Sequence, residues 1–284
     1  MKPQDTVFYQ KIDRIFDLTS PPLIMGILNI TPDSFFDGGK FNTEKEWLTK
    51  AAQLVEDGAD IIDIGAYSTR PSANFISIEE EAERLIPAII SIKKEFNNII
   101  ISADTFRATI AEKAIAAGAN IINDISGGSL DENMFRSVAQ LQVPYILMHT
   151  KGNPQNMQNL AIYTDVVKEV TDYFKEKVDE LNKLNFFKII IDPGFGFAKT
   201  VQHNFQLLNQ INNFKIFNLP ILVGLSRKSM ATKLLNIKTA DALNVSTVLN
   251  TLALNKGVNI LRVHDVKEAK EVITIHNYMN NVNE

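Results

Sequence analysis

Arg262 and His264, in the segment NILRVHD (259–265), are two residues whose types and spacing point directly to chemistry. In a β-strand, residues two apart lie on the same face, so these two side chains share a face and Val263 points to the other. Two cationic groups on the inward face of a strand are costly unless an anion meets them. We therefore predict that this strand binds an anionic ligand.

The segment VGLSRKSMATKLL (223–235) suggests a second anion site. Gly224 ends an apolar run, and SRKS (226–229) leads into a helical pattern. The first turn of a helix carries free N–H groups and the positive end of the helix dipole, which attract carboxylates and phosphates. A solvated basic turn with Ser229 as an ordinary N-cap fits the same spacing equally well.

Polar residues also stand at the ends of other apolar runs. The complete set is Asn29, Asp63, Asp104, Asn123, His149, Asp192, Ser226, Arg262 and His264. Any single Asp, Asn or Ser in such a place is explained equally well as the cap of a following helix. An uncharged Asn123 near ionised Asp104 and Asp192 suits a planar heterocyclic ligand that is rich in N–H donors and carries a phosphate group.

The segment DPGFGF (192–197) combines a carboxylate with a proline, two glycines and two phenylalanines. The proline and the glycines favour a tight turn, and glycine lets the backbone approach a ligand closely. The aromatic residues also suit a purely packing role at a rim.

Metal ligands are weakly specified. There are no cysteines, and the four histidines (149, 203, 264 and 276) lack the spacing of a zinc site. A Mg²⁺ ion held by Asn or Asp together with substrate oxygens would leave little trace in a sequence.

Eight short apolar runs position these residues. They cover residues 23–29, 60–65, 99–104, 120–125, 144–149, 188–192, 220–224 and 259–265. Runs that are almost continuously apolar are typical of parallel strands covered on both sides. Helical patterns separate the runs, as in the i, i+3, i+4, i+7 spacing of Leu48, Ala51, Ala52 and Val55. Three spacings match capping boxes at helix starts: Thr43 with Glu46, Ser77 with Glu80, and Asp265 with Glu268.

Eight strand–helix repeats in a chain of 284 residues predict a (β/α)₈ TIM barrel, an α/β fold that usually takes about 250 residues. A doubly wound open sheet is the alternative, but no glycine-rich dinucleotide loop follows the first strand. No linker interrupts the alternation, so we predict a single domain over residues 1–284. In such barrels the chemistry lies at the carboxyl ends of the strands, where the polar residues listed above collect.

Composition excludes several classes of partner. An apolar fraction of 45%, a charged fraction of 22% and a formal net charge of −4 suit a soluble globular protein and argue against nucleic-acid or membrane-surface binding. No signal peptide is visible, and no apolar run approaches the about 18 residues of a membrane helix. We therefore expect a cytoplasmic protein that acts on small molecules.

From about Leu23 to Val272 the chain resembles the dihydropteroate synthase family. The motifs that carry the resemblance occur in the family's order: GILNITPDSFFDGG (26–39), STRP (68–71), SADT (102–105), GANIINDISGG (118–128), LMHTKGNPQNMQ (147–158), IIIDPGFGF (189–197), VGLSRKS (223–229) and LRVHDV (261–266). Each motif alone is weak evidence, whereas the series in register on successive strands is specific.

The resemblance implies the joining of 6-hydroxymethyl-7,8-dihydropterin diphosphate to p-aminobenzoate, with release of diphosphate on the way to folate. It places the pterin on Asp104, Asn123, Asp192 and Lys228. It places the diphosphate on a second set: Arg262, His264, Thr69, Arg70 and Asn29. Asn29 is also the expected ligand of Mg²⁺.

The resemblance further implies that p-aminobenzoate stacks near Phe197, Pro71 and Phe35, with its carboxylate facing Ser229. The loop NITPDSFFDGG (29–39) would act as a lid, in which Asp37 orients Mg²⁺ or the loop itself. Lys228, Arg262 and Asp37 are the expected catalytic residues. The family also implies a homodimer and a target for sulfonamides.

The chain departs from the family pattern in places. The family's second loop reads GGESTRPG, and here it is GAYSTRPS, with Ala66, Tyr67 and Ser72; Ala198 replaces a common glycine after GFGF. Two other functions remain open. A methyltetrahydrofolate-dependent methyltransferase would share a pterin site but should lack SRKS and RVHD, and a non-enzymatic pterin-binding homologue is supported only by the altered second loop.

Overall fold

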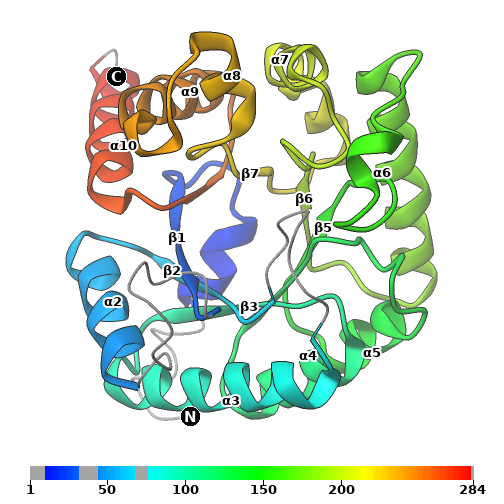
Figure 1. The fold of residues 1–284 in the computed structure, drawn as a ribbon, viewed down its shortest axis with the longest axis vertical. Helices are drawn as coiled ribbons and strands as arrows, with labels where there is room; N and C mark the ends of the chain where they lie inside the picture. Colours follow the sequence, from blue (N-terminus) through cyan, green and yellow to red (C-terminus); the bar gives the residue numbers. More distant parts are fainter. Residues whose placement is uncertain (1–9, 32–43, 68–75, 283–284) are drawn as a thin grey trace.

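Eight parallel strands form a barrel in the computed structural model, which describes residues 10–31, 44–67 and 76–282 (Figure 1). The strands are ordered β6-β5-β4-β3-β2-β1-β8-β7, so neighbours in the chain are neighbours in the barrel, apart from β8, which joins β1. A bridge between Ile191 and Ile221 links the two remaining edges. The predicted TIM barrel is confirmed, and the open doubly wound sheet is excluded.

Each strand falls inside one of the eight predicted apolar runs. Their bounds are β1 Leu23–Asn29, β2 Ile61–Gly65, β3 Ile100–Asp104, β4 Ile121–Asp124, β5 Tyr145–Met148, β6 Ile189–Asp192, β7 Leu222–Val223 and β8 Ile260–Val263. Nearly every strand residue is buried, because helices cover the outer face and side chains fill the inner one.

Helices follow the strands on the outside of the barrel (Figure 1). They are α2 Glu44–Glu56, α3 Ile78–Glu95, α4 Ala108–Ala116, α5 Met134–Leu141, α6 Val166–Lys183, α7 Val201–Asn209, α8 Ser229–Leu235, α9 Leu243–Asn255 and α10 Val266–Asn281. Short 3-10 turns are η1 Arg14–Phe16, η3 Met157–Leu160, η4 Ile211–Phe217 and η5 Thr239–Asp241. No helix in the described ranges is both long and apolar enough to cross a membrane.

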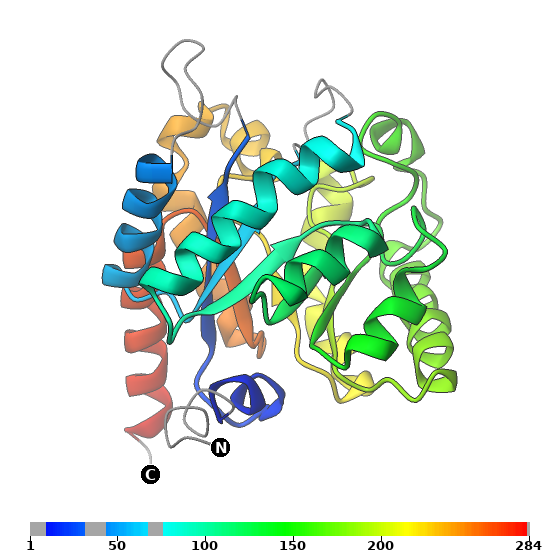
Figure 2. The ribbon, with the colours of Figure 1, turned by 90° about the horizontal axis from the view of Figure 1, so that it is seen from below.

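The barrel interior is a packed apolar layer. Every strand contributes to it, β1 with two side chains and each other strand with one: Leu23, Met25, Ile61, Ile100, Ile121, Ile146, Ile190, Leu222 and Ile260. Ile15 of η1 joins this layer from the lower end of the barrel (Figure 2). Burial of each such side chain stabilises the fold by about 1.5–3 kcal/mol. The cavity lined by the strand-end residues lies at the opposite end of the barrel from this η1 segment.

Of the predicted helix caps, the one at Ser77 is confirmed and the one at Asp265 is wrong. Ser77 Oγ accepts a hydrogen bond from the backbone N–H of Glu80 at 3.1 Å, as the sequence predicts. The prediction for Asp265 is wrong, because this side chain makes no cap bond to α10 and instead accepts from Arg227 at 2.6 and 3.0 Å. Thr43 lies outside the described residues.

Candidate active site

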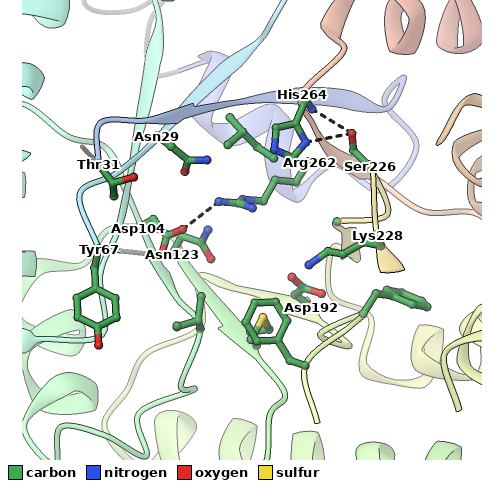
Figure 3. A pocket seen from close by; sticks show the side chains of 16 residues that line it. Asn29, Thr31, Tyr67, Asp104, Asn123, Asp192, Ser226, Lys228, Arg262 and His264 are labelled. Atoms are coloured by element: carbon green, nitrogen blue, oxygen red, sulfur yellow. Dashed lines mark hydrogen bonds and ion pairs between the residues drawn. The ribbon is translucent and has the colours of Figure 1, made fainter. Parts of the chain in front are cut away.

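A cavity opens at the carboxyl ends of the strands, where the sequence places the chemistry (Figure 3). Eight of the predicted site residues line it: Asn29, Asp104, Asn123, Asp192, Phe197, Lys228, Arg262 and His264. They come from strands or strand ends spread around the barrel, so closure of the sheet is what brings them together. The predictions for Phe35, Asp37, Thr69, Arg70 and Pro71 lie outside the described residues.

Arg262 is held by two carboxylates. Its Nε donates to Asp63 Oδ2 at 2.7 Å, and its NH2 group donates to Asp104 Oδ2 at 2.9 Å. A ligand anion is therefore not required to meet this cation, because the protein itself supplies the negative charge. The ion pairs also fix the direction of the guanidinium.

His264 does not carry the positive charge that the sequence argument gave it. Burial, assisted by the charge of Arg262, lowers the pKa of His264 to about 4, so the ring is neutral at neutral pH. Its backbone N–H donates to Ser226 Oγ at 3.3 Å, and its Nδ1 lies 3.2 Å from the same oxygen. The expectation of two adjacent cations is wrong, and His264 offers a neutral hydrogen-bonding group instead.

Asp63 is a residue to which the sequence gave no role. It is fully buried in β2, and its Oδ2 accepts hydrogen bonds from both Arg262 and the Asn123 amide, the latter at 3.1 Å. Its Oδ1 is buried without a hydrogen-bond partner among the described residues. The sequence could have indicated this role, because Asp63 is a carboxylate inside an otherwise apolar run. A buried carboxylate requires a partner.

The two carboxylates that face the cavity are harder to ionise than the sequence argument assumed. Burial and the nearby charge of Asp63 raise the pKa of Asp104 to about 7, although Arg262 opposes the shift. Burial also raises the pKa of Asp192, against the Gly194 N–H that donates to its Oδ1 at 2.8 Å. Both groups are poised to gain from a ligand that donates hydrogen bonds to them.

Lys228 points into the cavity and faces Asp192 (Figure 3). Its ammonium lies 4.6 Å from the centre of the Phe197 ring. Its stem passes over Gly196, where an added Cβ would lie 3.3 Å from Lys228 Cδ. Burial and the charge of Arg262 lower the pKa of Lys228 to about 8, so it keeps a proton near neutral pH.

The helix after SRKS begins as predicted, but its cap differs by one residue. Lys228 is the N-cap of α8, and Ser229 is the first helical residue. The alternative in which Ser229 is an ordinary N-cap is therefore wrong. Ser229 is exposed and lies outside the lining of the cavity, so the structure does not bring it together with the other site residues.

Three hydroxyl-bearing residues of the lining had been assigned no contact with a substrate: Thr31, Tyr67 and Ser226, of which Ser226 was noted only as a polar residue at a strand end. Tyr67 packs edge-on against Phe106, with ring centres 5.1 Å apart. Its position next to the STRP motif could have indicated that Tyr67 belongs to the site. This ring contact fixes the orientation of Tyr67 at the cavity.

The sequence of this barrel matches a known protein family and characterised relatives. The model of the "pterin binding enzyme" family matches residues 25–264. The dihydropteroate synthase of Escherichia coli K12 is 42% identical over 258 residues, which are 90% of this chain and 91% of the relative.

Two solved structures agree with the sequence match. The dihydropteroate synthase of Yersinia pestis with a sulfonamide drug complex superposes with a TM-score of 0.87 at 38% identity, over 93% of this chain and 96% of that one. The Xanthomonas albilineans dihydropteroate synthase with 4-aminobenzoic acid gives 0.86 at 36% identity, over 93% and 94%. The chain therefore belongs to the dihydropteroate synthase family of pterin binding enzymes.

Proposed function

We propose that this enzyme, a transferase of folate biosynthesis, condenses 6-hydroxymethyl-7,8-dihydropterin diphosphate with p-aminobenzoate to give 7,8-dihydropteroate and diphosphate. The observation that carries the proposal is the convergence of Asp104, Asn123, Asp192 and Lys228 in one buried cavity beside the guanidinium of Arg262. A methyltransferase is disfavoured, because SRKS and RVHD are present and their Ser226, Lys228, Arg262 and His264 line this cavity.

The pterin fits the polar end of the cavity. Asp104 and Asp192 have acceptor oxygens for the 2-amino group and the ring N–H groups, while Asn123 and Lys228 address the ring carbonyl and a ring nitrogen. The hydrogen bond from Asn123 Nδ2 to Asp63 fixes the orientation of the amide before the ligand arrives. A pocket whose donors and acceptors are already oriented loses little entropy on binding.

The reaction breaks the bond between the exocyclic methylene carbon of the pterin and the diphosphate oxygen. The amine of p-aminobenzoate forms a new C–N bond to the same carbon and gives up one proton. Negative charge develops on the departing diphosphate, and Arg262, already fixed by Asp63 and Asp104, is a preorganised positive partner for it. His264 adds a neutral hydrogen bond to the same anion.

We include Mg²⁺ in the proposal. Asn29 lies at the mouth of the cavity and offers an amide oxygen, which is a ligand type that Mg²⁺ accepts. The described residues contain no group of three or more His, Cys, Asp or Glu side chains that could hold a metal ion. Substrate oxygens and water would therefore complete the coordination, and the bound ion would neutralise charge on the diphosphate.

The p-aminobenzoate ring is placed against Phe197, beside the ammonium of Lys228. Its carboxylate would extend towards the start of α8 at Ser229, with Phe35 and Pro71 as the further expected contacts. The Yersinia pestis relative was crystallised with a sulfonamide drug complex. This supports the use of a sulfonamide as a competitor of p-aminobenzoate in tests of this subsite.

A homodimer and a cytoplasmic location complete the proposal. The dimer is supported by exposed apolar residues along α10 and its C-cap, at i, i+3, i+4 and i+7: Ile275, Tyr278, Met279 and the C-cap Val282, each more than 60% exposed. An exposed stripe of this kind is typical of a surface that another chain covers.

The test is an assay of diphosphate release with both substrates present. We expect release that requires the pterin diphosphate and p-aminobenzoate together, and inhibition by a sulfonamide that p-aminobenzoate relieves. Pterin diphosphate binding without any release of diphosphate would instead support the non-enzymatic homologue. Absence of pterin binding would overturn the assignment of the cavity.

A further inference from the structure

Lys199 has a buried amino group that the reaction described above does not use, and burial lowers the pKa of this group to about 7. It follows the DPGFGF turn between β6 and α7 and is only 4% exposed. No carboxylate among the described residues forms an ion pair with it. A buried ammonium without a paired anion is costly, so its position requires strong acceptors.

Backbone carbonyls supply most of these acceptors. Lys199 Nζ donates to the carbonyl oxygens of Gly194 and Phe197, both at 3.0 Å, and lies 3.3 Å from the carbonyl oxygen of His149. It also lies 2.9 Å from Nδ1 of His149, which accepts because burial lowers the pKa of this ring well below its ordinary value. The amino group thus ties the end of β5 to both ends of the turn 194–197.

The turn has a backbone that few sequences adopt. Gly194, Gly196 and Ala198 have φ values of 69°, 84° and 48°, in the left-handed region. An alanine there is uncommon, and a side chain on Gly194 is impossible because its Cβ would lie 2.0 Å from the carbonyl oxygen of His149. Such a conformation persists only when surrounding groups hold it, and Lys199 contacts two of its carbonyls.

Several site residues depend on the shape of this turn. Phe197 lies at its end, and the stem of Lys228 packs over Gly196. The backbone of Asp192 is held by the sheet, since it pairs with Met148 across β5 and β6 and its carbonyl accepts from the N–H of His149 at 2.9 Å, while its side chain accepts from the N–H of Gly194 at the start of the turn. A loosened turn would therefore displace Phe197, at its far end, more than Asp192.

We propose that Lys199 is a positioning residue for the second substrate: its amino group fixes the 194–197 turn so that Phe197 forms the wall that receives p-aminobenzoate. The inference rests on the proposed function, in which Phe197 contacts that substrate. It gives the buried lysine a role that is separate from pterin binding and from the contacts of Arg262 with the diphosphate.

The experiment compares Lys199→Met with Lys151→Met. The first change keeps most of the side-chain volume and removes the donors. The control removes the ammonium of a nearby lysine that pairs with Glu169 at 2.8 Å and lies 3.7 Å from the centre of the Tyr163 ring, away from the turn. We expect Lys199→Met to raise the KM for p-aminobenzoate tenfold or more, with the Kd for the pterin diphosphate changed less than threefold. Lys151→Met should change neither constant by more than twofold.

A purely structural role would give a different result. If Lys199→Met lowers the Tm and leaves the KM for p-aminobenzoate unchanged, the proposal is overturned. If this variant does not fold, Lys199→Gln replaces it, because the shorter amide keeps two N–H donors but cannot reach all four acceptors. An unchanged KM in Lys199→Gln would equally contradict the proposal. Failure of the wild-type enzyme to release diphosphate would instead count against the proposed function.

Discussion

Arg262 and Asp63 form an ion pair across β1, since β8 and β2 are the two neighbours of that strand. The same oxygen, Asp63 Oδ2, also accepts the hydrogen bond from Asn123 on β4. One buried carboxylate oxygen thereby links a residue assigned to the diphosphate with a residue assigned to the pterin. The two subsites cannot be displaced independently, which makes Asp63 a sensitive position.

Asp63→Asn should lower stability and turnover together. The amide keeps the shape of the side chain but removes the charge, and breaking one partner of a buried ion pair costs about 3–5 kcal/mol. We expect a clear fall in Tm and at least a tenfold loss of kcat/KM for the pterin diphosphate. Asp60→Asn, immediately before the same strand, is the control, because its Oδ2 accepts from the backbone N–H of Ile24 at 2.9 Å and Asp60 does not line the cavity. If Asp63→Asn keeps the kcat/KM of the wild type, the link between the two subsites does not contribute to catalysis.

Asp192→Ala should abolish pterin binding while the barrel remains folded. The change leaves N–H donors of the ligand without an acceptor in a buried site, where each lost partner costs about 1–3 kcal/mol and more when the partner is charged. Calorimetric titration with the pterin diphosphate measures the loss, and circular dichroism checks the fold. An affinity within about twofold of the wild type would mean that the pterin lies elsewhere.

Removal of Mg²⁺ should slow the reaction more than it weakens pterin binding. The ion is placed on Asn29 and the diphosphate, where it would stabilise charge that grows as the C–O bond breaks. We expect a large fall in kcat in excess chelator, with recovery when Mg²⁺ is restored. Turnover that continues unchanged in chelator would exclude the metal from the mechanism.

The fold could be predicted from the sequence because each strand is a local signal. Ile61, Ile100 and Ile121 lie in short, continuously apolar runs, and such runs separated by helical patterns leave few alternatives to a parallel barrel. The residues that form the site could be predicted from the same pattern. Residues at strand ends, such as Asp104 and Asp192, must lie close together at the carboxyl end of the barrel.

The contacts within the site could not be predicted, because they depend on closure of the barrel. Arg262 and Asp63 are 199 positions apart, and nothing local indicates that they touch. The neutral state of His264 follows from burial and from its neighbour, both of which are properties of the folded chain. The sequence around Lys199 suggests an ordinary solvated lysine before a helix. Its burial becomes visible only in the folded chain, where the turn packs against His149.

The contribution of Asp104 to the stability of the unliganded enzyme should fall as pH rises from about 4 to about 7. The pKa of Asp104 is about 7 in the folded state and close to 3.8 in the unfolded chain, so the folded state binds more protons between these values. This contribution to the free energy of unfolding therefore falls with rising pH across this window. This contribution is absent in Asp104→Asn. The Tm of the variant minus the Tm of the wild type should therefore be larger at pH 7.5 than at pH 4.5. A constant difference would contradict the raised pKa.

Pterin binding should release a proton near pH 6.5. At this pH, with a pKa of about 7, a large share of Asp104 is protonated in the free enzyme. The ring N–H donors of the pterin favour the ionised carboxylate, so binding lowers this pKa and displaces part of one proton. The release should vanish above about pH 8.5, where Asp104 is already ionised, and the affinity should rise as pH increases through the pKa of about 7.

Calorimetry of the pterin diphosphate in buffers with different ionisation enthalpies measures this release directly. At pH 6.5 the observed enthalpy should depend on the buffer with the sign of proton release, and the dependence should be reduced in Asp104→Asn. The diphosphate itself titrates, so the same ligand is measured against both proteins and only their difference is assigned to the enzyme. Equal release by the two proteins would place the pterin away from Asp104, and proton uptake in the wild type alone would mean that the ligand accepts a hydrogen bond from a protonated carboxyl.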